Sequence, residues 1–70
     1  MTQNEKVLAY IQKHGSITPR EAFNEFDIMR LASRISDLKK LGHPITSVTE
    51  TRTNSYGEKK SYARYFYGRV

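Results

Sequence analysis

Residues 16–45 read SITPREAFNEFDIMRLASRISDLKKLGHPI, and this stretch decides the fold. It opens with a strong helix start, in which Thr18 is the N-cap, Pro19 takes the first helical position and Glu21 completes a capping box. Proline loses nothing there, because its missing N–H would have no helical partner in any case. A short helix over residues 19–26 is therefore predicted. The residues expected on its buried side are Ala22, Phe23 and Phe26.

A second helical pattern follows in the same stretch. Apolar residues recur at three- and four-residue spacing, which is typical of a helix that buries one side. These residues are Ile28, Leu31, Ala32, Ile35, Leu38 and Leu41. The pattern predicts a helix over residues 28–41. Gly42 ends it, because glycine readily takes the left-handed conformation that closes helices, and Pro44 prevents the helix from resuming.

The N-terminal segment carries the same kind of helix signals. Thr2 and Glu5 have the spacing of a capping box, and Gly15 is the expected stop. The apolar stripe between them consists of Val7, Leu8 and Ile11. A first helix over residues 3–14 is therefore predicted.

The pattern changes from helix to strand in the last third of the chain. The segment ITSVTETRT is rich in threonine and valine, and KSYARYFYG is rich in aromatic residues, both of which favour strands. Between these segments, Asn54 and Gly57 tolerate the positive φ angles of turns. We predict a β-hairpin over residues 45–67, with its tip near residues 54–58.

Aromatic residues lie on both faces of the second predicted strand. Tyr62, Arg64 and Phe66 share one face, whereas Ala63, Tyr65 and Tyr67 share the other. The alternation alone leaves open which face packs on the helices. Exposed tyrosines can stack on the bases of a single strand, but packing on helices or on a second copy is the stronger expectation.

The composition limits the class of protein. The chain has 70 residues, which is the size of a single domain over residues 1–70, and it contains no cysteine. Disulfides and thiolate metal sites are therefore excluded. No apolar run approaches the roughly 20 residues that span a bilayer, and the N-terminus lacks the apolar stretch of a signal peptide. The cytoplasm is the expected location.

The net charge of +5 is unevenly distributed along the chain. Residues 1–50 hold seven Lys/Arg against six Asp/Glu, whereas residues 51–70 hold five Lys/Arg against Glu58 alone. The positive excess therefore lies in the last third. An acidic polymer such as nucleic acid is the natural partner of such a segment, and a charge excess that only keeps the protein in solution is the alternative.

Three helices, the second of them short, followed by a β-hairpin resemble the winged helix-turn-helix DNA-binding domains of small bacterial and phage regulators. Residues 16–45 carry the resemblance, and the hairpin extends it to nearly the whole chain. The ending RISDLKKLGHPI is its most specific part, because the recognition helix of this family often closes with leucines, a glycine and an apolar residue that begins the wing. The resemblance implies an α+β fold with a C-terminal β-hairpin wing.

One position departs from the family pattern. The turn between the two helices usually carries glycine, because its backbone needs a positive φ angle. This chain has Asp27 there. Aspartate visits that region more readily than most residues, and the alternative is that Asp27 caps the third helix.

The resemblance also implies a function, which is binding to double-stranded DNA. The third helix would enter the major groove, and the wing would touch the backbone or the minor groove. A small transcriptional regulator of a phage or mobile element is the first interpretation, and a recombination directionality or excision accessory factor is the nearby alternative. A protein-binding adaptor or inhibitor, which would use the tyrosine-rich face, is the alternative of a different class.

The outward side of the third helix supplies the first group of candidate DNA-binding residues. Arginine offers a two-pronged donor set that matches guanine, a small serine allows close approach, and methionine can touch a thymine methyl group. These residues are Met29, Arg30, Ser33, Arg34 and Lys40. The alternative is an ordinary solvated face, on which Arg30 or Arg34 only pairs with Asp37.

The hairpin and the start of the second helix supply the second group. Polar and cationic residues around a turn can grip phosphates or place a cation in the minor groove. The candidates are Arg20, Arg52, Asn54, Tyr56, Lys59 and Lys60. The alternative is that the lysines only protect the hairpin from pairing edge to edge with another chain.

Signals for catalysis, metals and cofactors are missing from the sequence. His14 and His43 have no metal-ligand spacing with each other or with a carboxylate, and no triad, paired carboxylates or glycine-rich phosphate loop is present. We therefore expect no enzyme, no metal and no cofactor. The expected partner is double-stranded DNA, with association to the nucleoid when bound and a possible homodimer on the DNA.

Overall fold

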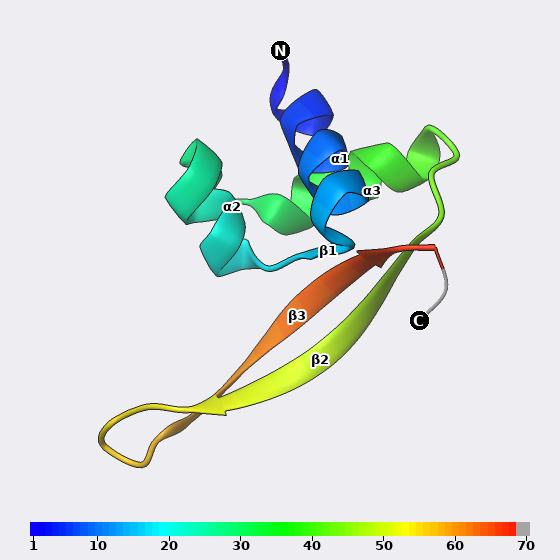
Figure 1. Cartoon of the computed structure of the whole chain (residues 1–70). Coiled ribbons are helices and arrows are strands. Elements are labelled where there is room, and N and C mark those ends of the chain that lie inside the picture. Colours follow the sequence, from blue (N-terminus) through cyan, green and yellow to red (C-terminus); the bar gives the residue numbers. More distant parts are fainter. Residues whose placement is uncertain (69–70) are drawn as a thin grey trace.

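Three helices pack over one end of a long β-hairpin in the computed structural model, which describes residues 1–68 (Figure 1). The elements in chain order are α1 (Gln3–His14), β1 (Ser16–Ile17), α2 (Pro19–Phe26), α3 (Leu31–Lys40), β2 (Ile45–Thr53) and β3 (Lys59–Tyr67). This order confirms the predicted α+β fold with a C-terminal hairpin. Arg69, which contributes to the positive charge of the last third, lies outside the described residues.

The three strands form one antiparallel sheet in the order β1-β3-β2. β2 pairs with β3 along its whole length, from Ile45 opposite Tyr67 to Thr53 opposite Lys59. β1 pairs only with the C-terminal end of β3, at Tyr65 and Phe66. From there to its tip the hairpin is a two-stranded ribbon, which extends away from the helices in Figure 1. The sequence does not predict β1, because two residues are too few to show a strand period.

The core lies between the helices and the three-stranded end of the sheet. Its buried residues are Val7, Ile11, Ile17, Ala22, Ile28, Leu31, Ile35, Leu38 and Ile45. Tyr65 and Tyr67 of β3 pack against this cluster. Tyr65 and Tyr67 therefore lie on the core side of β3, whereas Arg64 lies on the opposite face, which the first turn of α2 approaches through Glu21.

Three residues that the helical period assigned to the core are exposed. Phe23 keeps 48% of its surface and Leu41 keeps 71%, and Ala32 is also exposed. α3 ends at Lys40, so Leu41 lies in the following turn. Phe23 and Ala32 each follow a fully buried residue, from which they are rotated by about 100° around their helix. The prediction that these three residues are buried is wrong, because the buried stripe of each helix is narrower than the sequence pattern.

The turn between α2 and α3 corrects the predicted start of the third helix. Asp27 has φ 56° and ψ 28°, the left-handed conformation, and its backbone N–H donates to Phe23 at 2.8 Å. Asp27 therefore closes α2 and does not cap α3. The helix cannot begin at Ile28, and it starts instead at Leu31 with Arg30 as its N-cap. The positive φ angle expected between the two helices is thus present on an aspartate.

Both predicted capping boxes are present. At the start of α1, the backbone N–H of Glu5 donates to Thr2 Oγ1 and the N–H of Thr2 donates to Glu5 Oε1, each at 3.1 Å. At the start of α2, Glu21 N–H donates to Thr18 Oγ1 at 3.2 Å, and Thr18 N–H donates to Glu21 Oε1 at 2.9 Å. These hydrogen bonds satisfy two backbone N–H groups at each helix start, and they fix the residue at which each helix begins.

Candidate nucleic-acid interface

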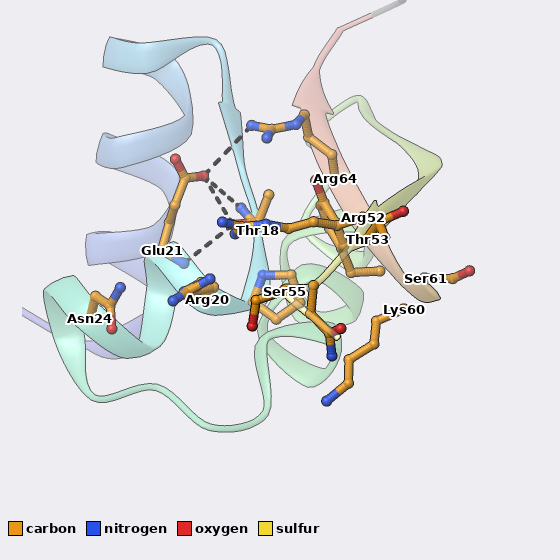
Figure 2. A pocket seen from close by; sticks show the side chains of 13 residues that line it. Thr18, Arg20, Glu21, Asn24, Arg52, Thr53, Ser55, Lys60, Ser61 and Arg64 are labelled. Atoms are coloured by element: carbon orange, nitrogen blue, oxygen red, sulfur yellow. Dashed lines mark hydrogen bonds and ion pairs between the residues drawn. The ribbon is translucent and has the colours of Figure 1, made fainter. Parts of the chain in front are cut away.

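A groove of about 760 Å³ lies between the start of α2 and the face of the hairpin that carries Arg52, Lys60 and Arg64. Figure 2 shows Arg20 and Asn24 on the helix side, with Arg52 and Lys60 on the hairpin side. The groove brings together four residues of the predicted second group, which are Arg20, Arg52, Asn54 and Lys60. Arg20 lies more than thirty positions before the other three in the sequence, so the groove exists only in the folded chain.

The hairpin wall of the groove concentrates positive charge. Arg52 and Lys60 are directly opposite each other in the β2–β3 register, so their side chains lie on the same face. Like charges in this arrangement destabilise a sheet unless an anion compensates them. Arg20 is exposed on the opposite wall, and none of the ion pairs within residues 1–68 involves these three cations. The groove is therefore suited to a polyanion.

The first predicted group lies away from this groove and is not a continuous helical surface. Ser33, Arg34 and Lys40 lie on α3, whereas Met29 and Arg30 lie in the turn before it. Met29 is 82% exposed, and Arg30 and Lys40 are exposed as well. None of the five lines the groove. The candidate residues thus form two surfaces, one at α3 and its preceding turn and one between α2 and the hairpin.

Comparison with known proteins identifies the family of the chain. A family model described as a winged helix-turn-helix domain matches residues 2–70. The chain belongs to this family. No curated protein sequence matches it. Membership confirms the resemblance carried by residues 16–45, and the fold of this family suggests binding to DNA and is typically not that of an enzyme.

In the terms of the winged helix-turn-helix family, α2, the Asp27 turn and α3 are the helix-turn-helix, and β2–β3 is the wing. The wing tip is built around Asn54. Its Oδ1 accepts hydrogen bonds from the backbone N–H groups of Tyr56 at 2.9 Å and Glu58 at 3.0 Å, and its Nδ2 donates to Glu58 Oε1 at 3.2 Å. The Asn54 side chain is therefore occupied in shaping the turn that the sequence predicts at residues 54–58.

The remaining predicted wing residues lie outside the groove. Tyr56 is 88% exposed at the tip. Lys59 is exposed on the face of the hairpin opposite to that of its neighbour Lys60. A ligand in the groove would therefore meet Lys60, whereas Lys59 is directed to the other side of the hairpin.

Arg34 forms the ion pair that the alternative interpretation describes. Its Nη2 lies 3.2 Å from Asp37 Oδ2, one helical turn along α3. Its Nε is shielded from solvent and has no hydrogen-bond partner among residues 1–68. An exposed pair of this kind contributes at most about 0.5 kcal/mol to the free energy of unfolding. Asp37 therefore orients the guanidinium without binding it strongly, and leaves Arg34 able to meet another acceptor.

Asn24 and Arg64 also line the groove, although neither is among the DNA-binding residues predicted from the sequence. Arg64 Nε donates to Glu50 Oε1 at 3.0 Å, a hydrogen bond that lowers the pKa of Glu50 and raises that of Arg64. The alternation of β3 predicts the face on which Arg64 lies, but its partners come from other elements of the fold.

The two histidines have structural neighbours. The rings of His14 and Tyr10 lie 4.3 Å apart at the end of α1, and His43 Nδ1 lies 3.4 Å from the Tyr67 hydroxyl group. Within residues 1–68, no three His, Cys, Asp or Glu side chains come close enough together to hold a metal ion. In the same part of the chain, each helix is too short or too polar to cross a membrane.

Proposed function

We propose that this protein binds duplex DNA through two surfaces. α3 and the turn before it lie in the major groove, and the groove between α2 and the wing takes the sugar-phosphate backbone or the minor groove edge. The observation that carries the proposal is the directly opposed pair Arg52 and Lys60, which faces Arg20 across the groove and has no acidic partner among residues 1–68. A phosphate backbone supplies the compensating negative charge.

Salt dependence tests the proposal directly. Each phosphate that a cation contacts releases counterions from the duplex, so log K falls with log salt by about 0.9 per contact. If Arg20, Arg52 and Lys60 each contact one phosphate, we expect a slope of about −2.7 or steeper on a random duplex. Fluorescence anisotropy at a series of salt concentrations measures it. Absence of binding at low salt overturns the proposal.

Arg34 and Arg30 are proposed to read bases from the major groove. Replacing either with alanine is expected to weaken binding to a preferred duplex by about tenfold and to relax the preference at one base position, since a two-pronged contact to guanine contributes about 1–3 kcal/mol. Selection from a random duplex library, with parent and variants in parallel, measures both effects. Lys39→Ala is the matched control, because Lys39 is an exposed cation on the same helix that is not assigned to the DNA surface. Equal base preferences for the parent and both arginine variants would place the reading surface elsewhere.

The finer proposal is a small transcriptional regulator of the phage or mobile-element type, acting in the cytoplasm on the nucleoid. It rests on the likeness of residues 16–45 to such regulators. One small domain offers few contacts to DNA, so we further propose that two copies bind adjacent half-sites. Sedimentation of the protein with a selected duplex measures the stoichiometry, and one copy per preferred site at saturation argues against the dimer.

A further inference from the structure

Arg64 joins three elements that meet at the inner end of the groove. Its Nη1 donates to Ser16 Oγ of β1 at 3.1 Å and lies 3.7 Å from Glu21 Oε1 of α2, the interaction drawn in Figure 2. Its Nε donates to Glu50 Oε1 of β2 at 3.0 Å. A single side chain on β3 therefore connects both neighbouring strands and the helix across the groove.

The partner on α2 is itself held in place. Glu21 Oε1 accepts from the backbone N–H of Thr18 at 2.9 Å and from its hydroxyl group at 3.2 Å, as part of the capping box. Thr18 is 5% exposed. The carboxylate that faces Arg64 is thus fixed to the first turn of α2, so an ion pair with it fixes β3 relative to that turn.

The position of Arg64 along β3 gives this connection its importance. β1 covers β3 only at Tyr65 and Phe66, so Arg64 is the first residue of β3 beyond the three-stranded part of the sheet. From there to the tip the wing is a two-stranded ribbon, which is marginally stable by itself. Of the ion pairs within residues 1–68, only that between Arg64 and Glu21 joins the wing to α2.

The charge of Arg64 is already matched inside the protein. Two carboxylates lie within 3.7 Å of its guanidinium, and 27% of its side chain is exposed. Arg52 and Lys60 lie on the same face of the hairpin farther toward the tip, and they have no such partners among residues 1–68. The groove therefore contains cations of two kinds, of which only the outer ones are available to an external anion.

We propose that Arg64 is a positioning residue, which sets the distance between the wing and α2 and thereby holds Arg52 and Lys60 opposite Arg20. This inference rests on the proposed binding of DNA. Arg64 itself contacts no phosphate. Its contribution to DNA affinity passes through the cations of the wing and leaves the contribution of α3 unchanged.

A double-mutant cycle tests this role. Arg64→Gln is expected to weaken DNA binding by about tenfold and to make the slope of log K against log salt shallower, because the misplaced Arg52 and Lys60 lose phosphate contacts. Lys60→Ala is expected to weaken binding clearly in the parent but by less than about threefold in the Arg64→Gln background. Arg34→Ala is expected to weaken binding equally in both backgrounds. Arg64→Lys, which keeps the charge but has a single donor head, is expected to restore part of the affinity.

Each outcome of the cycle is decisive. Binding of Arg64→Gln with the affinity of the parent overturns the positioning role. Equal losses from Lys60→Ala in both backgrounds overturn it as well. Should Arg64→Gln unfold, Glu21→Gln takes its place, because an amide oxygen still accepts from Thr18 while the negative charge facing Arg64 is removed.

A measurement on the free protein separates this inference from the proposed function. Residual dipolar couplings of the backbone amides report the orientation of β2 and β3 relative to α2. They are expected to show a reoriented wing in Arg64→Gln and in Glu21→Gln, and an unchanged wing in Lys60→Ala. An unchanged wing in all three variants overturns the inference even if the parent binds DNA. If the parent binds no DNA, the proposed function fails, whatever the wing does.

Discussion

Replacing Arg52 and Lys60 together with alanine is expected to weaken binding to a random duplex by about 100-fold at about 0.1 M salt. Each cation releases counterions from one phosphate in the proposed complex, so the slope of log K against log salt should become shallower by about 1.8. Removing two like charges from directly opposed positions relieves repulsion within the free wing. The unfolding midpoint of the variant should therefore not fall. Fluorescence anisotropy and thermal unfolding measure the two effects.

Lys6→Ala with Lys13→Ala is the matched control for this variant. Both residues lie on α1, and neither lines the groove between α2 and the wing. The net charge falls by the same amount in the control and in the test variant. A similar loss of affinity in both would show that the total charge of the protein, and not the groove, attracts the duplex. That result would contradict the proposed role of Arg52 and Lys60.

Replacing Leu38 with alanine is expected to lower the free energy of unfolding by about 3 kcal/mol, because a buried leucine loses its contacts and leaves a cavity. Leu38 is 2% exposed and belongs to the core cluster. A domain of this size has a total stability of only roughly 3–5 kcal/mol, so most of the variant should be unfolded at room temperature. Urea unfolding followed by circular dichroism measures the change.

Leu41→Ala supplies the matched control, because the sequence pattern assigns both leucines to the same buried stripe. Leu41 is 71% exposed, and its replacement should change the free energy of unfolding by less than about 0.5 kcal/mol. If Leu41→Ala destabilises the protein as much as Leu38→Ala, then Leu41 is covered in solution, for example by a second copy of the chain. The pair of variants therefore also tests whether this part of the surface is free.

Local signals in the sequence were sufficient for most of the elements. The capping boxes at Thr2 and Thr18 act between residues three positions apart, and the glycine after the first helix acts on its own backbone. Such effects need no tertiary contact, so α1 and α2 have their observed bounds in the prediction. Asn54 and Gly57 likewise locate the wing tip, because the turn depends on hydrogen bonds and φ angles within five residues.

The signals fail where burial depends on distant neighbours. The apolar pattern places Ile28 and Leu41 in the third helix, yet both lie outside α3. Ile28 is nevertheless buried, because the Asp27 turn directs it into the core, whereas Leu41 is directed to solvent. The hydrophobic periodicity of a sequence indicates which residues favour burial, but it does not indicate whether the chain around them is helical.

The candidate site was likewise predicted from the sequence only in part. Residue chemistry pointed to Arg20, Arg52 and Lys60, although their role in DNA binding is still a prediction. The sequence alone determined the starts of α1 and α2 and the position of the wing tip, because each depends on interactions within a few residues. Only the tertiary structure brought Arg20 opposite the wing, and only it joined Arg64 to Glu21 and Glu50. Those arrangements depend on how β3 packs between β1 and β2, and sheet pairing joins residues that no local pattern connects.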